Sequence, residues 1–503
     1  MNLRHTPNVD HLSFGFLLAC LTLFAVGTAP VHAGPPQQTE IAKLLASQGI
    51  ELERFGTAVS IDGDTLVVGA PNYVPEPTGP GSVYVYNRDA QGNWTEYATL
   101  VVCDAACGDG FGEAVSIDGD TIIVGAPAAA NSEISGAAYI FTRNQQGDWI
   151  QQAKLEVADP QITKLGGSVA LQRNTAVVGL ISTTVPDVFI FVRDQDGHWS
   201  HESTLSAPGT NSHNSLAIQG DTIIIGAPFF SDDNNQTTIG AVYIFTRDEK
   251  GIWAQQAQLL DPNPEFFYNA FGFSVAFDSN ILVIGSITFS VDRAYIFDRN
   301  ERGDWSMQQV LDPDGNSSSD NFGASVAIQG NTLVVGASHD APSGAAHIFT
   351  RDARGIWSEH AKLLQSDAGN NDNFGAAVAL DNDTIIVGAR GDDDNGSSSG
   401  SAYIFDAAGA PAFPADITGP RDVPDGCVDA FDLGAMLGAW CSAVNDPNPP
   451  SPPCENCTPA NLAVADISGA GNVPDGCVDA FDLAKLLAEW CSVPGGNPCG
   501  TCQ

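Results

Sequence analysis

The sequence predicts an all-β fold, a seven-bladed β-propeller closed by an N-terminal strand, followed by a small α-helical, cysteine-rich loop–helix tail. The main observation is a repeated phrase, first seen as Phe-Gly-Thr-Ala-Val-Ser-Ile-Asp-Gly-Asp-Thr-Leu-Val-Val-Gly-Ala-Pro from Phe55. Each copy is followed by an aromatic segment, and in the first six copies a turn and a tryptophan come next. Periods of this length, with about four short strands each, are typical of propellers. The further copies, 47 to 59 residues apart, begin at Phe111, Leu165, Ser212, Phe271, Phe322 and Phe374.

The first repeat predicts how one blade is built. Residues 58–61 form a short inner strand, and Asp62 and Gly63 form a two-residue turn of the kind that favours positive φ. The apolar run 66–69 is typical of a strand buried between neighbouring blades. Residues 83–86 then give the third strand and residues 94–100 the outer strand.

Two side-chain roles follow from this repeat. Phe55 is predicted to fill the gap between blades, and Gly56 to permit a close backbone approach. Arg88 and Trp94, at the two ends of the next turn, are predicted to stack as a cation–π pair.

The last repeat lacks an outer strand, and the N-terminus carries the missing segment. The seventh copy stops at residues 403–405 without a tryptophan, whereas residues 39–45 match residues 358–364 almost residue for residue. The N-terminal segment is therefore expected to complete the last blade, which removes open sheet edges.

The repeats resemble the FG-GAP repeat, known from integrin α subunits and many secreted bacterial proteins. Phe-Gly followed by Val-Gly-Ala-Pro stands intact in the first two copies, and the repeats cover residues 39–407. The resemblance implies a propeller fold, but the interval that often holds a calcium loop in that family is here only a tight hairpin with too few oxygens to wrap an ion. The calcium sites of the family are therefore not expected in these turns.

The longer connections differ between copies and are acidic. Because binding residues often lie on loops held by a rigid scaffold, this face is predicted to bind a protein or glycan ligand. Calcium is a candidate there, and the alternative is that these acids are simply solvated. The candidate residues are Asp232, Asp233, Asn235, Asp392, Asp393 and Asp394.

The N-terminus predicts export. Residues 1–33 read as a secretory signal peptide, with an apolar core and a small-residue cleavage site before Gly34; the alternative is a lipoprotein site at Cys20. No other apolar run is long enough to span a bilayer, so the protein is expected to be secreted or on the cell surface and not membrane-spanning. The formal charge of −40 repels phosphate backbones and therefore excludes nucleic acid as a partner.

The region after residue 407 divides into a linker at 408–414, a first unit at 415–442, a proline- and cysteine-rich spacer at 443–464 and a second unit at 465–503. The two units resemble the duplicated loop–helix calcium module of dockerins, through a shared Asp-Gly-Cys-Val-Asp-Ala-Phe-Asp-Leu. The resemblance implies a calcium ion in each unit and a cohesin-like or surface partner. The implied ligands are Asp416, Thr418, Asp425, Cys427 through its carbonyl, Asp429 and Asp432, then Asp466, Ser468, Asp475, Cys477, Asp479 and Asp482.

The units also depart from the dockerin pattern. About five extra residues separate the first ligands from Asp425 or Asp475, and Ala430-Phe431 stands where the partner-recognition hydroxyls are expected. The alternative role of Asp429 and Asp432 is to cap a helix and complement its dipole.

The cysteines outside the signal are even in number and clustered, which in an exported chain favours disulfides; zinc at the Cys-x-x-Cys pairs is the alternative. They are Cys103, Cys107, Cys427, Cys441, Cys454, Cys457, Cys477, Cys491, Cys499 and Cys502.

No familiar catalytic motif is present, so the sequence analysis predicts a protein that is not an enzyme. The leading hypothesis is a secreted or cell-surface binding or adhesion protein, with a calcium-dependent tail for attachment. The alternatives are an exported hydrolase acting on polysaccharide or phosphodiester, and a structural exoprotein whose tail is a sorting signal.

Overall fold

The structure, a computed structural model, describes residues 38, 40–72, 81–102, 109–127, 136–157, 164–181, 187–208, 215–231, 238–262, 268–288, 291–312 and 320–407. The predictions for the signal peptide, Cys103, Cys107, Asp232, Asp233, Asn235 and the whole of the tail lie outside these residues. Within them no helix is long and apolar enough to span a membrane.

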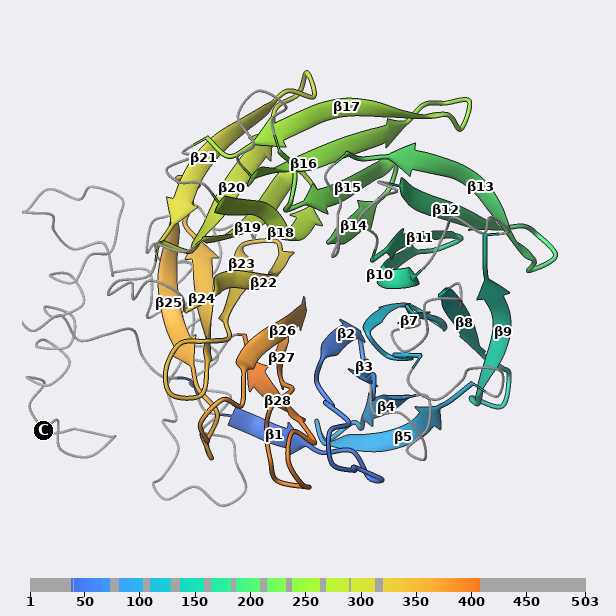
Figure 1. Ribbon diagram of the computed structural model, residues 1–503, viewed down its shortest axis with the longest axis vertical. Coiled ribbons are helices and arrows are strands. Elements are labelled where there is room, and N and C mark those ends of the chain that lie inside the picture. The colour runs from blue at the N-terminus through green and yellow to red at the C-terminus, as the bar shows by residue number, and fades with distance from the viewer. Residues whose placement is uncertain are drawn as a thin grey trace, which may run out of the picture. The chain divides into compact units, whose positions relative to one another are not determined.

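The described strands form repeated, propeller-like four-stranded antiparallel sheets, arranged around a ring in Figure 1. Four sheets follow the chain in order and are β2–β5 (Ala58–Asp62, Thr65–Ala70, Ser82–Arg88, Trp94–Leu100), β6–β9 (Ala114–Asp118, Thr121–Ala126, Ala137–Arg143, Trp149–Leu155), β10–β13 (Leu165–Gln172, Thr175–Leu180, Asp187–Arg193, Trp199–Ser206) and β22–β25 (Phe322–Gln329, Thr332–Ala337, Ala345–Arg351, Trp357–Leu363).

Two further sheets depart from this simple order. An eight-stranded sheet joins β14–β17 (Leu216–Gln219, Thr222–Ala227, Thr238–Arg247, Trp253–Leu260) to β18–β21 (Tyr268–Asp278, Ile281–Thr288, Arg293–Arg299, Trp305–Leu311) through a parallel contact between β16 and β18. The last sheet has the order β1-β28-β27-β26, with β1 at Glu40–Leu44, β26 at Phe374–Asp381, β27 at Thr384–Ala389 and β28 at Ser401–Asp406.

The last sheet confirms the predicted role of the N-terminal segment. β1 pairs antiparallel with β28, with Lys43 opposite Tyr403 and Leu44 opposite Ala402. The matching segment pairs in the same way inside its own sheet, where Lys362 of β25 lies opposite His347 of β24. The two similar sequences therefore occupy equivalent outer positions. β25 directly follows its partner β24 in the chain, whereas β1 comes from the opposite end of the repeat region to its partner β28.

The core lies in the second strands and in the aromatic residues between the sheets. Every residue of β3, β7, β15 and β27 is buried, as the apolar runs predicted. Phe55 is fully buried, and its ring centroid lies 5.4 Å from that of Tyr84 in an edge-to-face arrangement. Gly56 has a φ of 87°, and a Cβ built there would lie 2.3 Å from the carbonyl oxygen of Ser401. Both predicted roles at the junction between sheets are confirmed.

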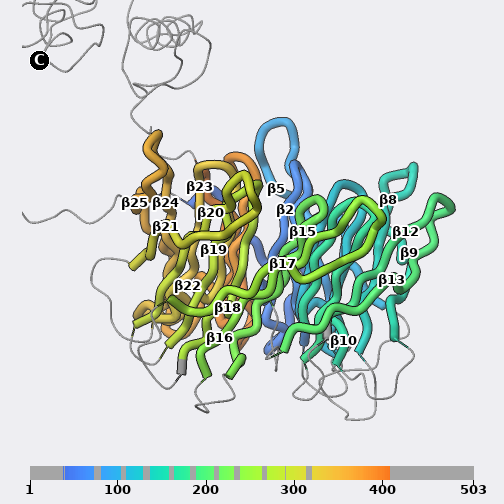
Figure 2. Tube along the Cα trace, turned by 90° about the horizontal axis from the view of Figure 1, so that it is seen from above, coloured from blue at the N-terminus to red at the C-terminus, as the bar shows by residue number. Residues whose placement is uncertain are grey.

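The tight turns lie on one edge of the sheets, which we call the turn face. Two residues join the first and second strands of each set, and one predicted boundary is corrected here: the loop is Gly63 and Asp64, because Asp62 still pairs with Thr65 as the last residue of β2. The opposite edge carries the connections between second and third strands and those between sheets; we call it the loop face. In Figure 2 the strands run between these two faces.

Hydrogen bonds on the turn face link each sheet to the next. The last residue of each inner strand accepts, through its side chain, a backbone N–H from the turn of the following four-stranded set, at 2.5–2.7 Å in six of the seven pairs. The series returns to its starting sheet. Its acceptor–donor pairs are Asp62–Gly119, Asp118–Arg173, Gln172–Gly220, Gln219–Ser279, Asp278–Gly330, Gln329–Asn382 and Asp381–Gly63.

Arginine at the end of the third strand adds a second link. The guanidinium of Arg88 lies 5.4 Å from the Trp94 ring, as predicted, and donates a hydrogen bond of 3.0 Å to Thr384 of the neighbouring sheet. Arg143 repeats both contacts, with Trp149 at 4.8 Å and Thr65 at 3.1 Å. These arginines therefore connect neighbouring sheets along the turn face.

Candidate functional site: acidic groups of the loop face

Three carboxylates of the loop face converge on the ammonium group of Lys43. Lys43 Nζ donates to Asp367 Oδ2 at 2.6 Å, to Asp394 Oδ2 at 2.6 Å and to Asp392 Oδ2 at 3.1 Å. Asp367 follows β25, whereas Asp392 and Asp394 lie in the connection between β27 and β28. We call Lys43 and these three carboxylates the clasp cluster, because Lys43 belongs to the N-terminal strand β1.

The surrounding hydrogen bonds fix the most buried carboxylate. Asp392 is 3% exposed, and its Oδ1 accepts the Ser401 hydroxyl at 2.8 Å and the Asp394 N–H at 3.1 Å. The Tyr403 hydroxyl donates towards Asp392 Oδ2 at 3.0 Å and Asp367 Oδ1 at 2.9 Å, and the Lys43 ammonium lies 5.1 Å from the Tyr403 ring. Asp393 points elsewhere and accepts the Ser398 N–H at 2.7 Å.

The charges of the clasp cluster stabilise one another. Burial would lower the pKa of Lys43, but the hydrogen bonds to Asp367, Asp394 and Asp392 raise this pKa above its ordinary value. Burial would likewise raise the pKa of Asp367, but hydrogen bonds from Lys43 and Tyr403 hold that pKa below its usual range. Lys43 and Asp367 are therefore each held in the ionised form at neutral pH.

The same carboxylates bear on the predicted calcium site. Oxygens of Asp367, Asp392 and Asp394 lie within 4.8 Å of one another, a spacing that would suit a metal ion. The Lys43 ammonium lies at the centre of this group, so an ion there would have to displace it. Calcium at residues 392–394 stays a prediction, as does calcium at 232–235.

A second acidic pair on the loop face brings two carboxyl groups together. Asp292, in the connection between β19 and β20, is fully buried; Asp320, just before β22, is 6% exposed and hydrogen-bonds to it. Asp292 also accepts the N–H groups of Thr288 at 2.7 Å and Asn321 at 2.8 Å. A hydrogen bond between two carboxyl groups requires a proton on one of them. Burial raises the pKa of Asp292 to about 6, against the effect of the two N–H donors, and the Asp320 charge raises it further.

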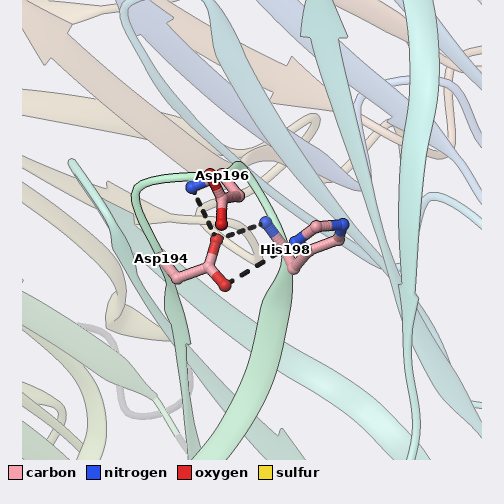
Figure 3. Close-up of side chains that lie close together, drawn as sticks. All are labelled: Asp194, Asp196 and His198. Atoms are coloured by element: carbon pink, nitrogen blue, oxygen red, sulfur yellow. Dashed lines mark hydrogen bonds and ion pairs between the residues drawn. The ribbon is translucent and has the colours of Figure 1, made fainter.

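A third group lies on the turn face, in the five-residue turn between β12 and β13 (Figure 3). Asp194 Oδ1 accepts the N–H groups of Asp196 at 2.9 Å and His198 at 2.8 Å, and Asp194 Oδ2 lies 3.6 Å from His198 Nδ1. The N–H hydrogen bonds lower the pKa of Asp194. All three side chains are exposed, and the same Asx pattern recurs at Asp89 and Asp248, so this geometry belongs to the turn.

Sequence reasoning singled out Asp392 and Asp394 but missed the partners that decide their chemistry. Lys43 and Asp367 are separated by 324 positions in the chain, and no local pattern joins them. The one available signal was the match between residues 39–45 and 358–364, which places Lys43 on an outer strand beside the last repeat. Asp292 and Asp320 belong to different repeats and were not predicted as a pair.

The family model described as the FG-GAP repeat matches residues 38–86, 94–141, 199–245, 305–349 and 357–405. The chain carries FG-GAP repeats. The first of these matches begins in the N-terminal segment that supplies β1, and the last ends in β28. No curated protein matches the chain.

Among solved structures, the chain is similar to the periplasmic gluconolactonase PpgL of Pseudomonas aeruginosa, with 14% identity, a TM-score of 0.44, and coverage of 63% of this chain and 86% of the other. A putative 6-phosphogluconolactonase of Bacteroides fragilis gives 13% identity, a TM-score of 0.44, and coverage of 64% and 86%. A Lactobacillus plantarum protein gives 14% identity, the same TM-score, and coverage of 63% and 86%.

This finding corrects the expectation that the chain is not an enzyme. That expectation rested on the absence of a familiar motif, and the similar structures include a gluconolactonase and a putative 6-phosphogluconolactonase. Absence of a motif therefore does not exclude catalysis here. At 12–14% identity, the likeness assigns no reaction to this chain.

Proposed function

We propose that the chain is a secreted or cell-surface binding and adhesion protein whose loop face binds a protein or glycan. In this proposal the FG-GAP repeats form a seven-bladed ring, with the eight-stranded sheet counting as two blades. The closed series of turn-face hydrogen bonds, from Asp62–Gly119 round to Asp381–Gly63, supports that count. The signal peptide predicted at 1–33 supports export.

The observation that carries the proposal is the contrast in length between the two kinds of connection. On the turn face the connections are uniform, as between Asp62 and Thr65 and between Asp118 and Thr121. On the loop face the second-to-third-strand connection ranges from four residues, between Thr288 and Arg293, to eleven, between Ala389 and Ser401. Rigid scaffolds with variable loops are the usual arrangement of binding proteins.

The loop face is also acidic, and this favours a ligand that presents cationic or hydrogen-bond-donating groups. Lys43 and Asp392 are not expected to contact a ligand, because within the clasp cluster their side chains are only 15% and 4% exposed. Asp394, at 51%, and the predicted residues at 232–235 are left as the groups that would meet a ligand.

Binding of the full-length chain to an array of purified glycans and extracellular proteins tests this proposal. The Asp232→Asn/Asp233→Asn variant is expected to weaken binding to the captured ligand about tenfold, because two charges leave the loop face. The matched control is Asp148→Asn/Asp196→Asn, which removes two exposed charges from the turn face and is expected to bind normally. Equal weakening by both variants would contradict the assignment of the ligand to the loop face.

For the tail we propose calcium-dependent attachment, on the dockerin-like pattern at 425–433 and 475–483. Calorimetric titration of the full-length chain with calcium is expected to show two sites that are lost in Asp432→Asn/Asp482→Asn. The Asp232→Asn/Asp233→Asn variant is the control and would retain both. Unchanged calcium binding in the tail variant would remove the basis for this attachment.

A further inference from the structure

A polar pocket of about 610 Å³ lies on the turn face, away from the proposed ligand site. Its walls are Gln256 of β17, Asn280 of the β18–β19 turn, Arg299 at the end of β20, and residues 300–303 of the turn before β21. It therefore bridges two consecutive four-stranded sets, whose strands β17, β20 and β21 are labelled in Figure 1. Two of its seven lining residues are arginines, in a chain that has only 20 basic residues against 60 acidic ones.

Arg299 differs from most arginines at the equivalent position because it has no acidic partner among the described residues. Arg88 pairs with Asp64 at 2.8 Å, Arg247 with Glu202 at 2.8 Å and Arg351 with Asp298 at 3.3 Å. In the Arg299 sheet, the position of Asp64 is taken by the neutral Asn280, as it is by Asn174 and Asn331 in two other sheets. There, however, Arg193 bonds Asn174 at 2.9 Å and Arg351 pairs with Asp298. The Arg299 guanidinium donates a hydrogen bond of 3.5 Å to Thr222 and lies 5.9 Å from the Trp305 ring.

The neighbouring tryptophan also has an unused donor. Trp199 Nε1 donates to Gln152 at 3.0 Å and Trp253 Nε1 to Glu202 at 3.3 Å, but the buried Trp305 Nε1 has no hydrogen-bond partner. Gln256, the residue equivalent to Gln152, donates to the carbonyl oxygen of Gly303 at 3.0 Å, as Gln152 does to that of Gly197 at 3.2 Å, so only the tryptophan hydrogen bond is missing here. Trp149 Nε1 is unpartnered too, but its arginine, Arg143, lies 3.8 Å from Asp120.

The lining of this pocket offers several hydrogen-bond donors. Arg299, Arg302 and Asn280 supply N–H groups, whereas Glu301 is the only carboxylate among the lining residues. A planar guanidinium recognises carboxylate and sulfate oxygens through paired hydrogen bonds, and the amide and carboxylate groups suit hydroxyls. We propose that this pocket binds an acidic saccharide, with its anionic group on Arg299 and Arg302 and its hydroxyls on Asn280 and Glu301.

This site is independent of the loop-face proposal and is tested with the full-length chain. Trigalacturonic acid is titrated against protein labelled with ¹⁵N at tryptophan, and the Trp305 indole N–H is assigned through Trp305→Phe. Saturable movement of this resonance is expected, and Arg299→Gln should weaken binding at least tenfold. The matched control, Arg193→Gln, removes an arginine that also stacks on a tryptophan, Trp199 at 5.5 Å, but already bonds Asn174 at 2.9 Å; it should bind normally.

Three results would overturn the proposal. One is no movement of the Trp305 resonance at millimolar trigalacturonate. Another is an equal response to the neutral trisaccharide maltotriose or to inorganic sulfate alone, which would mean that the saccharide and its charge are not recognised together. The last is equal loss of binding in Arg299→Gln and Arg193→Gln at matched thermal stability, since that would assign the effect to the turn scaffold.

Discussion

The clasp cluster and the Asp292–Asp320 pair both place carboxyl groups in buried surroundings on the loop face. The pKa shifts of Asp367 in the first and Asp292 in the second have opposite signs. In the clasp cluster a lysine from the far end of the repeat region donates to three carboxylates, and the pKa of Asp367 lies below its ordinary value. Asp292 is buried beside another carboxyl group, that of Asp320, and its pKa rises to about 6. A cationic partner and an acidic partner thus shift the pKa of an aspartate in opposite directions.

Removing Lys43 would leave the clasp cluster, like the Asp292–Asp320 pair, as carboxyl groups in contact. Of the changes considered, we expect this one to lower stability the most. Lys43→Met leaves three carboxylates together without a cation and is expected to lower the free energy of unfolding by about 2–4 kcal/mol at pH 7, less than for a fully buried pair because Asp367 and Asp394 are partly exposed. The loss should shrink towards pH 4, where carboxylates take up protons. Urea denaturation at both pH values measures it.

The matched control is Lys362→Met, which removes the equivalent lysine of β25. Lys362 pairs with the carboxylate of Asp340 at 2.5 Å. Its strand, β25, follows its hydrogen-bonded partner β24 directly in the chain. The expected loss is about 1 kcal/mol. Equal losses for the two variants would show that the clasp cluster has no special role in closing the last sheet.

The Asp320→Asn variant tests how much of the raised pKa of Asp292 is due to the neighbouring carboxylate. Because the charge of Asp320 raises the pKa of Asp292, removing it should move the Asp292 pKa from about 6 towards its ordinary value. Wild-type protein gains protons at Asp292 on folding between about pH 4 and pH 6, so this group makes stability fall as pH rises through that window. The variant should lose less stability over the same range, by about 1 kcal/mol. A ¹³C titration of the Asp292 carboxyl checks the shift, and an unchanged pKa would leave burial as the only cause.

The smallest effect concerns the link between the last sheet and the first. Asp381→Ala removes the acceptor of the Gly63 N–H at 2.7 Å and of Gln329 at 2.8 Å, for an expected loss of about 1 kcal/mol. Asp381 lies on the turn face and Lys43 on the loop face side of the same sheet, with no shared partner. The losses in the Lys43→Met/Asp381→Ala double variant should therefore add within about 0.5 kcal/mol in the same denaturation experiment. A clear departure from additivity would mean that the clasp cluster and the turn-face hydrogen bonds of Asp381 are energetically coupled.

The strands could be predicted from sequence because their signals are local and repeated. The predicted outer strand at 94–100 is β5 itself, and the predicted apolar run 66–69 lies within β3. The placement of residues 39–45 also succeeded, because the segment resembles a strand whose position the other repeats define. The first turn was misplaced by one residue, since Asp62 serves both as the last pairing residue and as an acceptor for the next sheet.

The chemistry of the candidate sites was less predictable, because it depends on contacts between repeats. Acidic residues at 392–394 are visible in sequence, but the lysine that neutralises them is not. Arg299 and Asn280 look in sequence like Arg193 and Asn174, and only the contacts in three dimensions show that Arg193 bonds its asparagine whereas Arg299 bonds Thr222. The same limit explains why the lack of a local catalytic motif is no argument against enzymatic activity.

The position of β28 has a mechanical consequence. Asp406 ends β28 and leads towards the region predicted to attach the protein, so a pull on that region would load β28 first. β28 is not an edge strand, because it is hydrogen-bonded to β1 on one side and to β27 on the other. Extracting it requires two ladders to be sheared at once, with Lys43 resisting on one of them. The strand from the chain's beginning thus reinforces the point where tension would enter from its end.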